Sequence, residues 1–200
     1  MLDEQGIMRM KYLGINISWR EKTSNELVEI MKDKSVWDEY QELRKKFNIG
    51  KKEYRISQGK DCRLTYEVIN DQLGDFDGII ADLGCGGNEL AKLRPQNKVY
   101  GFDFYAMDDT IIPCSITDVP LDDESVDVVV ISLALSTSDY HLVLYEASRI
   151  LKKGGLLKLV LVTFSKILGD VVRKYLPNMG FSEAEMITID NLVYIDSVKN

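Results

Sequence analysis

The sequence predicts an α/β protein with a doubly wound, mostly parallel sheet of seven strands, an antiparallel hairpin at the sheet edge and a small helical cap at the N-terminus. Two observations support this fold class. From Gly78 onward, uninterrupted apolar runs alternate with segments of helical spacing, which is typical of strands buried on both faces of a parallel sheet. The last two apolar runs are separated by almost nothing, so they are expected to pair as a hairpin.

The chain divides into a helical cap, residues 1–75, and a sheet domain, residues 76–200. In the cap, apolar side chains recur at helical spacing in two segments, and Ser24 and Ser35 are suitable N-caps for them. A third helix is expected to lead into the first strand. The predicted helices of the cap span 24–32, 35–47 and 61–73.

The sheet domain alternates strands and helices along its length. A helix from about Tyr140 to Leu151 is expected to end at Lys152–Gly155, because basic residues followed by glycine suit a helix C-terminus. Another helix is expected over about 166–176. The predicted strands span 78–82, 98–103, 110–114, 126–132, 156–162, 186–190 and 192–197.

Composition excludes several classes of protein. The 200 residues are 45% hydrophobic and 28% charged, with a net charge of -7, which is ordinary for a soluble domain. The first residues lack the apolar core of a signal peptide, and the longest apolar run, Val126–Leu135, is far shorter than the roughly 20 residues of a membrane span. Three scattered cysteines and a single histidine, His141, give no metal-ligand spacing. We therefore expect an intracellular monomer without a metal or membrane contact.

The stretch from Ile79 to Gly87, IIADLGCGG, carries the strongest chemical signal. An apolar strand ends in Asp82, and a glycine turn with Gly84 and Gly86 follows. Nineteen residues after Gly84, the next apolar run ends in Asp103. Glycines at the end of a first parallel strand let the backbone approach a nucleotide, and a carboxylate at the tip of the next strand can accept both ribose hydroxyl protons. The pattern indicates a Rossmann-like site for a nucleoside-containing cofactor.

The details of the turn favour one cofactor. The third glycine of a dinucleotide-binding motif is missing, and Asp82 would be unfavourable beside a diphosphate. An acid at that position suits a cationic amino-acid end, such as the ammonium and sulfonium of S-adenosylmethionine. The segment 112–116 could place backbone and an apolar side chain against the adenine. We expect S-adenosylmethionine as cofactor and S-adenosylhomocysteine as product.

Motifs after the glycine turn indicate which class of cofactor-binding protein this is. The lead-in Leu121-Asp122-x-x-Ser125-x-Asp127, a strand, a helix ending in Lys-Gly-Gly and a further strand resemble the layout of class I methyltransferases. The segments SVDVVVISLALS, EASRILKKGGLLKLVLV and MGF, with Lys11-Tyr12-Leu13 and Trp37-Asp38-Glu39-Tyr40 near the N-terminus, resemble the nucleomethylin-type family of large-subunit ribosomal RNA adenine-N1 methyltransferases. The resemblance implies RNA methylation in ribosomal RNA processing and a nuclear or nucleolar location, with the cytoplasm left open.

The same resemblance implies a set of cofactor-binding residues. Gln41 stands where the family usually has histidine and Ser115 where it usually has aspartate, so both positions remain polar. We add three residues next to the glycine turn and the second strand: Asp82, Gly86 and Phe104. The residues implied by the resemblance are Gln41, Gly84, Asp103, Ser115, Ile116 and Ser132.

The acceptor is expected at the carboxyl end of the strand 126–132. Methyl transfer to a nitrogen with a free lone pair, such as adenine N1, gains mostly from alignment of donor and acceptor. Ser136 and Asp139 are the candidate catalytic residues, although their segment differs from the Met-Gly-Thr-Asn run of the family. Asp139 could accept a hydrogen bond from an exocyclic amine or cap the helix that follows, and we favour the cap.

A basic stretch predicts where RNA binds. Residues 44–63 carry eight basic side chains and two acids in an otherwise acidic protein, which would confine RNA contact to one edge; a solvated helix face is the alternative. The same fold also admits a small-molecule or protein methyltransferase, or a non-catalytic module that binds the cofactor and docks to a partner. The candidate RNA-binding residues are Lys45, Lys46, Lys51, Lys52 and Arg55.

Overall fold

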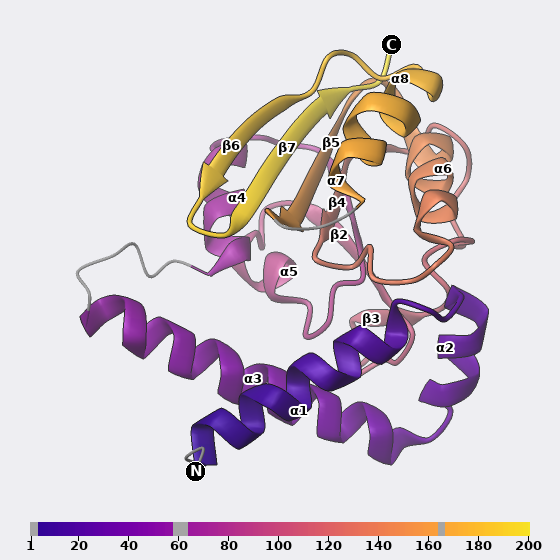
Figure 1. Cartoon of the computed structure of the whole chain (residues 1–200). Coiled ribbons are helices and arrows are strands. Elements are labelled where there is room, and N and C mark those ends of the chain that lie inside the picture. Colours follow the sequence, from indigo (N-terminus) through magenta and orange to yellow (C-terminus); the bar gives the residue numbers. More distant parts are fainter. Residues whose placement is uncertain (1–3, 58–63, 164–166) are drawn as a thin grey trace.

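In the part of the chain that the computed structural model describes, residues 4–57, 64–163 and 167–200, seven strands form one sheet (Figure 1). The strands are β1 (Ile79–Leu83), β2 (Lys98–Asp103), β3 (Ile111–Pro113), β4 (Val126–Ser132), β5 (Leu151–Val162), β6 (Glu185–Ile189) and β7 (Leu192–Val198). Their order is β3-β2-β1-β4-β5-β7-β6. The pairs from β3 to β5 are parallel, whereas β7 is antiparallel to both β5 and β6. The predicted parallel sheet with an antiparallel edge hairpin is therefore confirmed.

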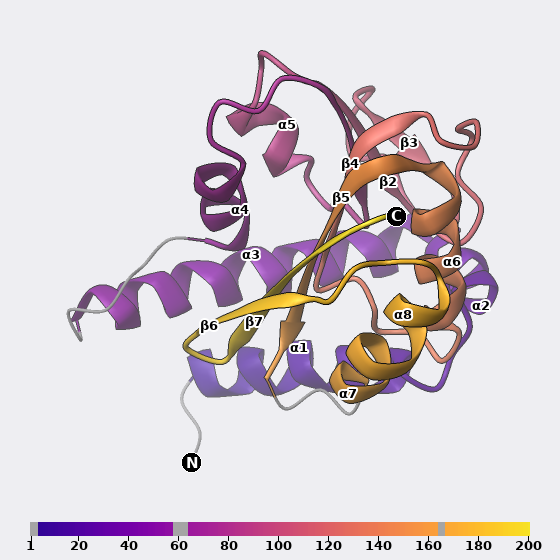
Figure 2. The same ribbon diagram turned by 90° about the horizontal axis from the view of Figure 1, so that it is seen from above.

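Helices cover both faces of the sheet (Figures 1 and 2). On one face lie α4 (Thr65–Leu73) and α5 (Glu89–Leu93). On the other lie α6 (Tyr140–Ile150) and a segment made of α7 (Leu168–Asp170), the π-helical turn η1 (Val171–Tyr175) and α8 (Leu176–Asn178). The short helix α5 was not predicted, because five residues are too few to show helical periodicity.

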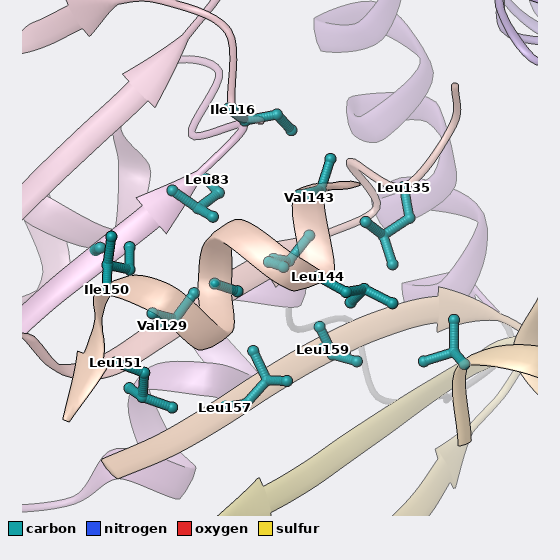
Figure 3. Packing of buried hydrophobic residues seen from close by; sticks show 14 of the residues in the cluster. Leu83, Ile116, Val129, Leu135, Val143, Leu144, Ile150, Leu151, Leu157 and Leu159 are labelled. Atoms are coloured by element: carbon teal, nitrogen blue, oxygen red, sulfur yellow. The ribbon is translucent and has the colours of Figure 1, made fainter. Parts of the chain in front are cut away.

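Successive strand residues supply two separate cores. Leu83, Val129 and Leu157 point toward α6, where Figure 3 shows them packed among its apolar side chains. Their neighbours along the strands, including Ile80 and Val128, pack under α4. All five side chains are at most 1% exposed. The two-sided burial explains why the strands appear in the sequence as unbroken apolar runs.

The boundary between α6 and β5 differs from the prediction. Helix α6 ends at Ile150, and Leu151 is already extended and paired with Val126 of β4. The ladder then shifts register, and Gly154 adopts a φ of 75°, which favours glycine. Lys152–Gly155 therefore form an irregular strand start instead of a helix C-terminus.

The N-terminal helices lie across the carboxyl ends of the parallel strands (Figures 1 and 2). They are α1 (Glu4–Trp19), α2 (Ser24–Met31) and α3 (Lys34–Ser57). Helix α1 was not predicted, and α3 extends ten residues beyond the predicted end of 47. The predicted helix 61–73 is described from Thr65, and its residues 61–63 lie outside the described part of the chain.

The serine caps are wrong by one or two residues. Thr23 precedes α2, where its hydroxyl accepts from Glu26 N–H while the Glu26 carboxylate accepts from Thr23 N–H in a capping box. Asp33 precedes α3, where one carboxylate oxygen accepts from the N–H and hydroxyl of Ser35. The capping acceptor therefore lies one residue before Ser24 in α2 and two residues before Ser35 in α3.

The cap has its own apolar cluster of Trp19, Leu27, Met31 and Trp37. Tyr40 joins it, with its ring centroid 4.4 Å from that of Trp19. Trp37 also packs on Tyr105 of the sheet domain, with ring centroids 6.2 Å apart, so this cluster joins the cap to the sheet domain. Among the described helices, none combines the length and apolar character needed to cross a membrane.

Candidate cofactor and acceptor site

The glycine turn after β1 is held tightly between three elements. Gly84 and Gly86 adopt φ values of 81° and 60°, which favour glycine. Gly84 N–H and Cys85 N–H both donate to Phe102 O of β2, at 2.8 and 3.0 Å. A Cβ on Gly84 would overlap Ala134 in the loop after β4. The turn therefore fits closely against β2 and the β4 loop, and its backbone forms the floor of the site.

Asp103 closes β2 directly beside this turn. Its Oδ2 accepts from Gly86 N–H at 2.7 Å, and its Oδ1 accepts from Phe104 N–H at 2.8 Å. Burial raises the pKa of Asp103 to about 6, although the two N–H donors act in the opposite direction. The structure thus brings together Gly86, Asp103 and the backbone of Phe104, as the sequence pattern suggested.

Asp82 lies beneath the turn and is fully buried. Its Oδ1 accepts from the Tyr66 hydroxyl at 3.2 Å, while its Oδ2 has no hydrogen-bond partner among the described residues. Burial raises the pKa of Asp82 to about 7, and the nearby Asp103 adds to the shift. A buried carboxyl with an unused oxygen is a site that a cation would satisfy.

The ends of β3 and β4 supply a further wall. Ile116 is 4% exposed, and its Cδ1 lies 4.0 Å from the position of a Cβ on Gly84. Ser115 is half-buried and its hydroxyl lies 2.7 Å from the Thr117 hydroxyl. Ser132 is half-buried at the last position of β4, opposite Val160 of β5. Of these predicted cofactor residues, the structure places Ile116 against the turn.

The cap forms the remaining wall. Phe104 packs partly buried against the apolar cluster of the cap. Gln41 lies on α3, where its Oε1 accepts from Arg44 Nη1 at 3.3 Å; its buried Nε2 lacks a partner in the described part of the chain. The cap and the sheet domain therefore build the site together.

The loop after β4, where the acceptor was expected, is tied to the cap. Both carboxylate oxygens of Asp139 accept from Ser24 N–H, at 3.0 and 2.9 Å, and Oδ1 also accepts from the Ser24 hydroxyl at 3.0 Å. Ser138 N–H donates to Lys22 O at 2.8 Å. Asp139 precedes α6 but makes no side-chain cap bond to it. The expected cap of α6 is therefore wrong, and Asp139 binds the first turn of α2 instead.

Ser136 and Leu133 of the same loop differ in how far their side chains are buried. Ser136, the second candidate catalytic residue, is half-buried. Leu133, directly after β4, adopts a φ of 59° and leaves 45% of its side chain exposed. A non-glycine residue held in this conformation stores roughly 1–3 kcal/mol of strain, and such residues cluster at functional sites. The loop therefore presents an apolar side chain at the carboxyl edge of the sheet.

Within the described residues, the basic side chains of the predicted stretch divide between the surface of α3 and the glycine turn. Lys45 and Lys46 are exposed on α3, and Lys46 forms an ion pair with Glu42 at 2.5 Å. Arg44 instead points inward, because a Cβ on Gly86 would overlap its guanidinium. The side chains of Lys51, Lys52 and Arg55 lie outside the described part of the structure.

Sequence reasoning missed three residues of the site. Tyr66 and Ser24 reach it from other helices, and no local pattern connects them with Asp82 or Asp139. Arg44 could have been found, because it lies one helical turn after Gln41 and so shares its face of α3.

The residues present fit an adenosine cofactor with a cationic amino-acid end. Gly86 lets a charged group, here the Arg44 guanidinium, lie directly against its backbone, and Asp103 stands beside it. Asp82 Oδ2 and Gln41 Nε2 are polar atoms without a partner in the described residues. No group of three His, Cys, Asp or Glu within the described ranges could hold a metal ion. This site and the β3-β2-β1-β4-β5-β7-β6 sheet define the class of S-adenosylmethionine-dependent methyltransferases.

The chain belongs to the family described as hypothetical methyltransferase, whose profile matches residues 21–197. It is 38% identical over 121 residues to the 25S rRNA (adenine(645)-N(1))-methyltransferase of Schizosaccharomyces pombe, covering 58% of this chain and 38% of that protein. It is 32% identical over 167 residues to ribosomal RNA-processing protein 8 of Dictyostelium discoideum, covering 78% of this chain and 40% of that protein. The chain thus spans about two fifths of the length of these relatives.

The fold is also shared with solved methyltransferase structures. One is the 1,6-didemethyltoxoflavin-N1-methyltransferase of Burkholderia thailandensis, whose structure contains S-adenosylhomocysteine. The two chains are 12% identical with a TM-score of 0.53, over 68% of this chain and 76% of that chain. At this identity the likeness shows the fold alone. The family and the fold agree with the resemblance found in the sequence.

Proposed function

We propose that this protein transfers a methyl group from S-adenosylmethionine to a ring nitrogen of adenine in ribosomal RNA. The observation that carries the cofactor assignment is the contact between Gly86 and Asp103, with the unsatisfied Asp82 oxygen beneath them. The acceptor assignment is supported by the two relatives whose names refer to ribosomal RNA. Those relatives also support a nucleolar location.

The residues of the site have distinct tasks in this reaction. The bound cofactor supplies an electrophilic methyl group on a sulfonium. Asp103 would hold the ribose hydroxyls, Asp82 would face the cationic amino-acid end, and Ile116 would cover one side of the adenine. Gly84 lets Ala134, and Gly86 lets the Arg44 guanidinium, lie directly against the backbone of the turn. Each residue acts by fixing position, which is the main source of rate in a displacement between two bound molecules.

The acceptor needs orientation more than it needs a base. Adenine N1 has a free lone pair, so it can form the new C–N bond while the C–S bond breaks and its electron pair stays on sulfur. The loop 133–139 would orient the base, because Asp139 and Ser138 fix it to the cap and Leu133 offers an exposed apolar surface. A base inside folded RNA has to be unstacked before it can reach such a pocket. Ser136 is the polar side chain of this loop that we assign to contact with the base.

A small-molecule or protein acceptor is the second candidate. It is favoured by the net charge of -7 and by the Lys46–Glu42 ion pair, which reduces the basic character of α3. A third candidate, cofactor binding without turnover, is favoured by the engagement of both Asp139 carboxylate oxygens with Ser24.

One assay separates the three. The protein is incubated with S-adenosylmethionine carrying a labelled methyl group and, in parallel, with an unmodified large-subunit ribosomal RNA transcript, a metabolite extract and a protein extract. The expected result is label in the RNA, recovered as 1-methyladenosine after digestion to nucleosides. Asp103→Asn, which keeps size but weakens ribose binding, serves as the control and should abolish labelling. Label in metabolites or protein alone would contradict the RNA acceptor, and cofactor binding with no labelled product would support the third candidate.

A further inference from the structure

Arg44 is the one residue of the basic stretch whose side chain is shown to lie against the glycine turn. It sits on α3, one turn after Gln41, and its Nη1 donates to Gln41 Oε1 at 3.3 Å. A Cβ built on Gly86 would overlap the guanidinium, so Arg44 packs directly on the glycine backbone. Only glycine at position 86 allows this approach. The cap therefore delivers a permanent positive charge to the floor of the site.

Two buried carboxyls share this floor with Arg44. The Arg44 guanidinium packs on Gly86, whose N–H donates to Asp103 Oδ2. Burial raises the pKa of both Asp82 and Asp103, and the charge of Arg44 acts in the opposite direction. The hydrogen bonds of the two acids go to Tyr66, Gly86 and Phe104. The Arg44 guanidinium therefore donates none of these hydrogen bonds.

The arrangement matches a zwitterion. An amino-acid end carries an ammonium and a carboxylate a few ångströms apart, and each needs a partner of opposite charge when it leaves water. Asp82 Oδ2 is free for the cation. A guanidinium has five N–H donors in a planar fork, which suits bidentate binding of a carboxylate.

We propose that Arg44 binds the carboxylate of the cofactor's methionine end and makes the site selective for a cofactor that carries this carboxylate. The proposal rests on the proposed function, because it assumes that S-adenosylmethionine or its product occupies the site. It also removes Arg44 from the RNA-binding stretch 44–63 and makes the cap part of the cofactor site.

The test compares two ligands that differ by one carboxylate. S-adenosylmethionine and its decarboxylated form share the adenosine, the sulfonium and the ammonium. Their dissociation constants are measured by isothermal titration for the wild type, Arg44→Met, Arg44→Lys and Lys45→Met. We expect Arg44→Met to weaken binding of S-adenosylmethionine at least tenfold and to change binding of the decarboxylated form less than twofold. Arg44→Lys, which keeps the charge but loses the fork, should fall between wild type and Arg44→Met.

The control variant is matched in position and chemistry. Lys45 is the next residue on α3 and is exposed, so Lys45→Met should leave both constants unchanged. Equal weakening of both ligands by Arg44→Met would assign Arg44 to packing of the cap and overturn the proposal, as would unchanged binding of both. Failure of the wild type to bind S-adenosylmethionine would instead overturn the proposed function itself.

Discussion

Asn88 stands in the turn one residue before Glu89, the position that the third glycine of a dinucleotide-binding motif would occupy. It is 2% exposed and adopts a φ of 55°, a conformation that asparagine tolerates better than most residues. Its Nδ2 donates to Thr110 Oγ1 at 3.0 Å, which ties the turn to the residue before β3. The left-handed conformation that a glycine would adopt freely is here held by an asparagine whose side chain makes a specific hydrogen bond.

Asp82 illustrates a conflict between stability and binding at a single residue. Burial raises its pKa from 3.8 to about 7, so the folded protein holds this proton more tightly than the unfolded chain. The stability from Asp82 is therefore fully present below pH 4 and is lost as the pH rises through 7. We expect Asp82→Asn to stabilise the cofactor-free protein at pH 8, by on the order of 2 kcal/mol, as measured by urea unfolding.

The same substitution should weaken S-adenosylmethionine binding, since the carboxylate that faces the cation is removed. Asp127 is the control, because bonds from Lys152 and Ile79 N–H lower its pKa against the effect of burial. Asp127→Asn should therefore destabilise the protein at pH 8. If Asp82→Asn instead destabilises the protein at pH 8, burial does not raise the pKa of Asp82 in the folded protein.

At the scale of elements, the loop after β4 and the start of α2 form a connection across 115 residues of sequence. We name the bonds between Ser24 and Asp139 the latch. Asp139→Ala should remove the latch, free the first turn of α2 and weaken cofactor binding, because Gln41 and Arg44 depend on the position of the cap. Hydrogen exchange of the amides of α2 and titration with S-adenosylmethionine measure the two effects.

A double-mutant cycle isolates the latch from other roles of its partners. Ser24→Ala removes the hydroxyl bond but keeps the two backbone N–H bonds, whereas Asp139→Ala removes all three. The effect of Ser24→Ala should therefore largely vanish in the Asp139→Ala background, which makes the two substitutions non-additive. Asp108→Ala, an exposed aspartate after β2, should leave exchange of α2 unchanged. Additive effects of the two latch substitutions would mean that Ser24 and Asp139 act independently.

The lysines of α3 test the prediction on RNA. Neutralising Lys45, Lys46, Lys51 and Lys52 to glutamine should lower the affinity for RNA and reduce its dependence on salt, because each phosphate contact contributes to the salt slope. Binding is measured by fluorescence anisotropy at several salt concentrations. Lys98→Gln with Lys153→Gln is the control, since both lysines are exposed at the amino ends of β2 and β5. An equal loss of RNA affinity in the control variant would show that α3 is not a specific RNA-binding surface.

The sequence predicted the sheet well and the cap poorly, for a physical reason. Strands β1, β4 and β7 are buried on both faces, so their apolar runs alone mark them. Helix α1 shows only a weak apolar face, and its partner for packing is α3, far along the chain. Likewise, the turn and Asp103 follow from local spacing, whereas the Tyr66–Asp82 bond and the latch depend on how distant elements meet.

At the scale of the whole molecule, the proposed cofactor site is shared by the cap and the sheet domain. The sheet domain supplies Asp82, Asp103 and the turn, and the cap supplies Gln41 and Arg44. S-adenosylhomocysteine should therefore slow hydrogen exchange in α2, in the described first half of α3 and around β1 and β2 together. Helix α8, which packs on the opposite side of the sheet from α4, is the internal reference and should not change. Protection confined to the sheet domain would show that the cap does not take part in cofactor binding.

During synthesis on the ribosome, Ser24 is made long before its partner Asp139. The cap helices are synthesised first, and their partner loop follows 115 residues later. At translation rates of about 5–20 residues per second, the delay is roughly 6 to 23 s. Tyr105 follows Trp37 by 68 residues, so for roughly 3 to 14 s Trp37 lacks this ring as a packing partner. The proposed cofactor site is therefore complete only after the loop that follows β4 has been synthesised.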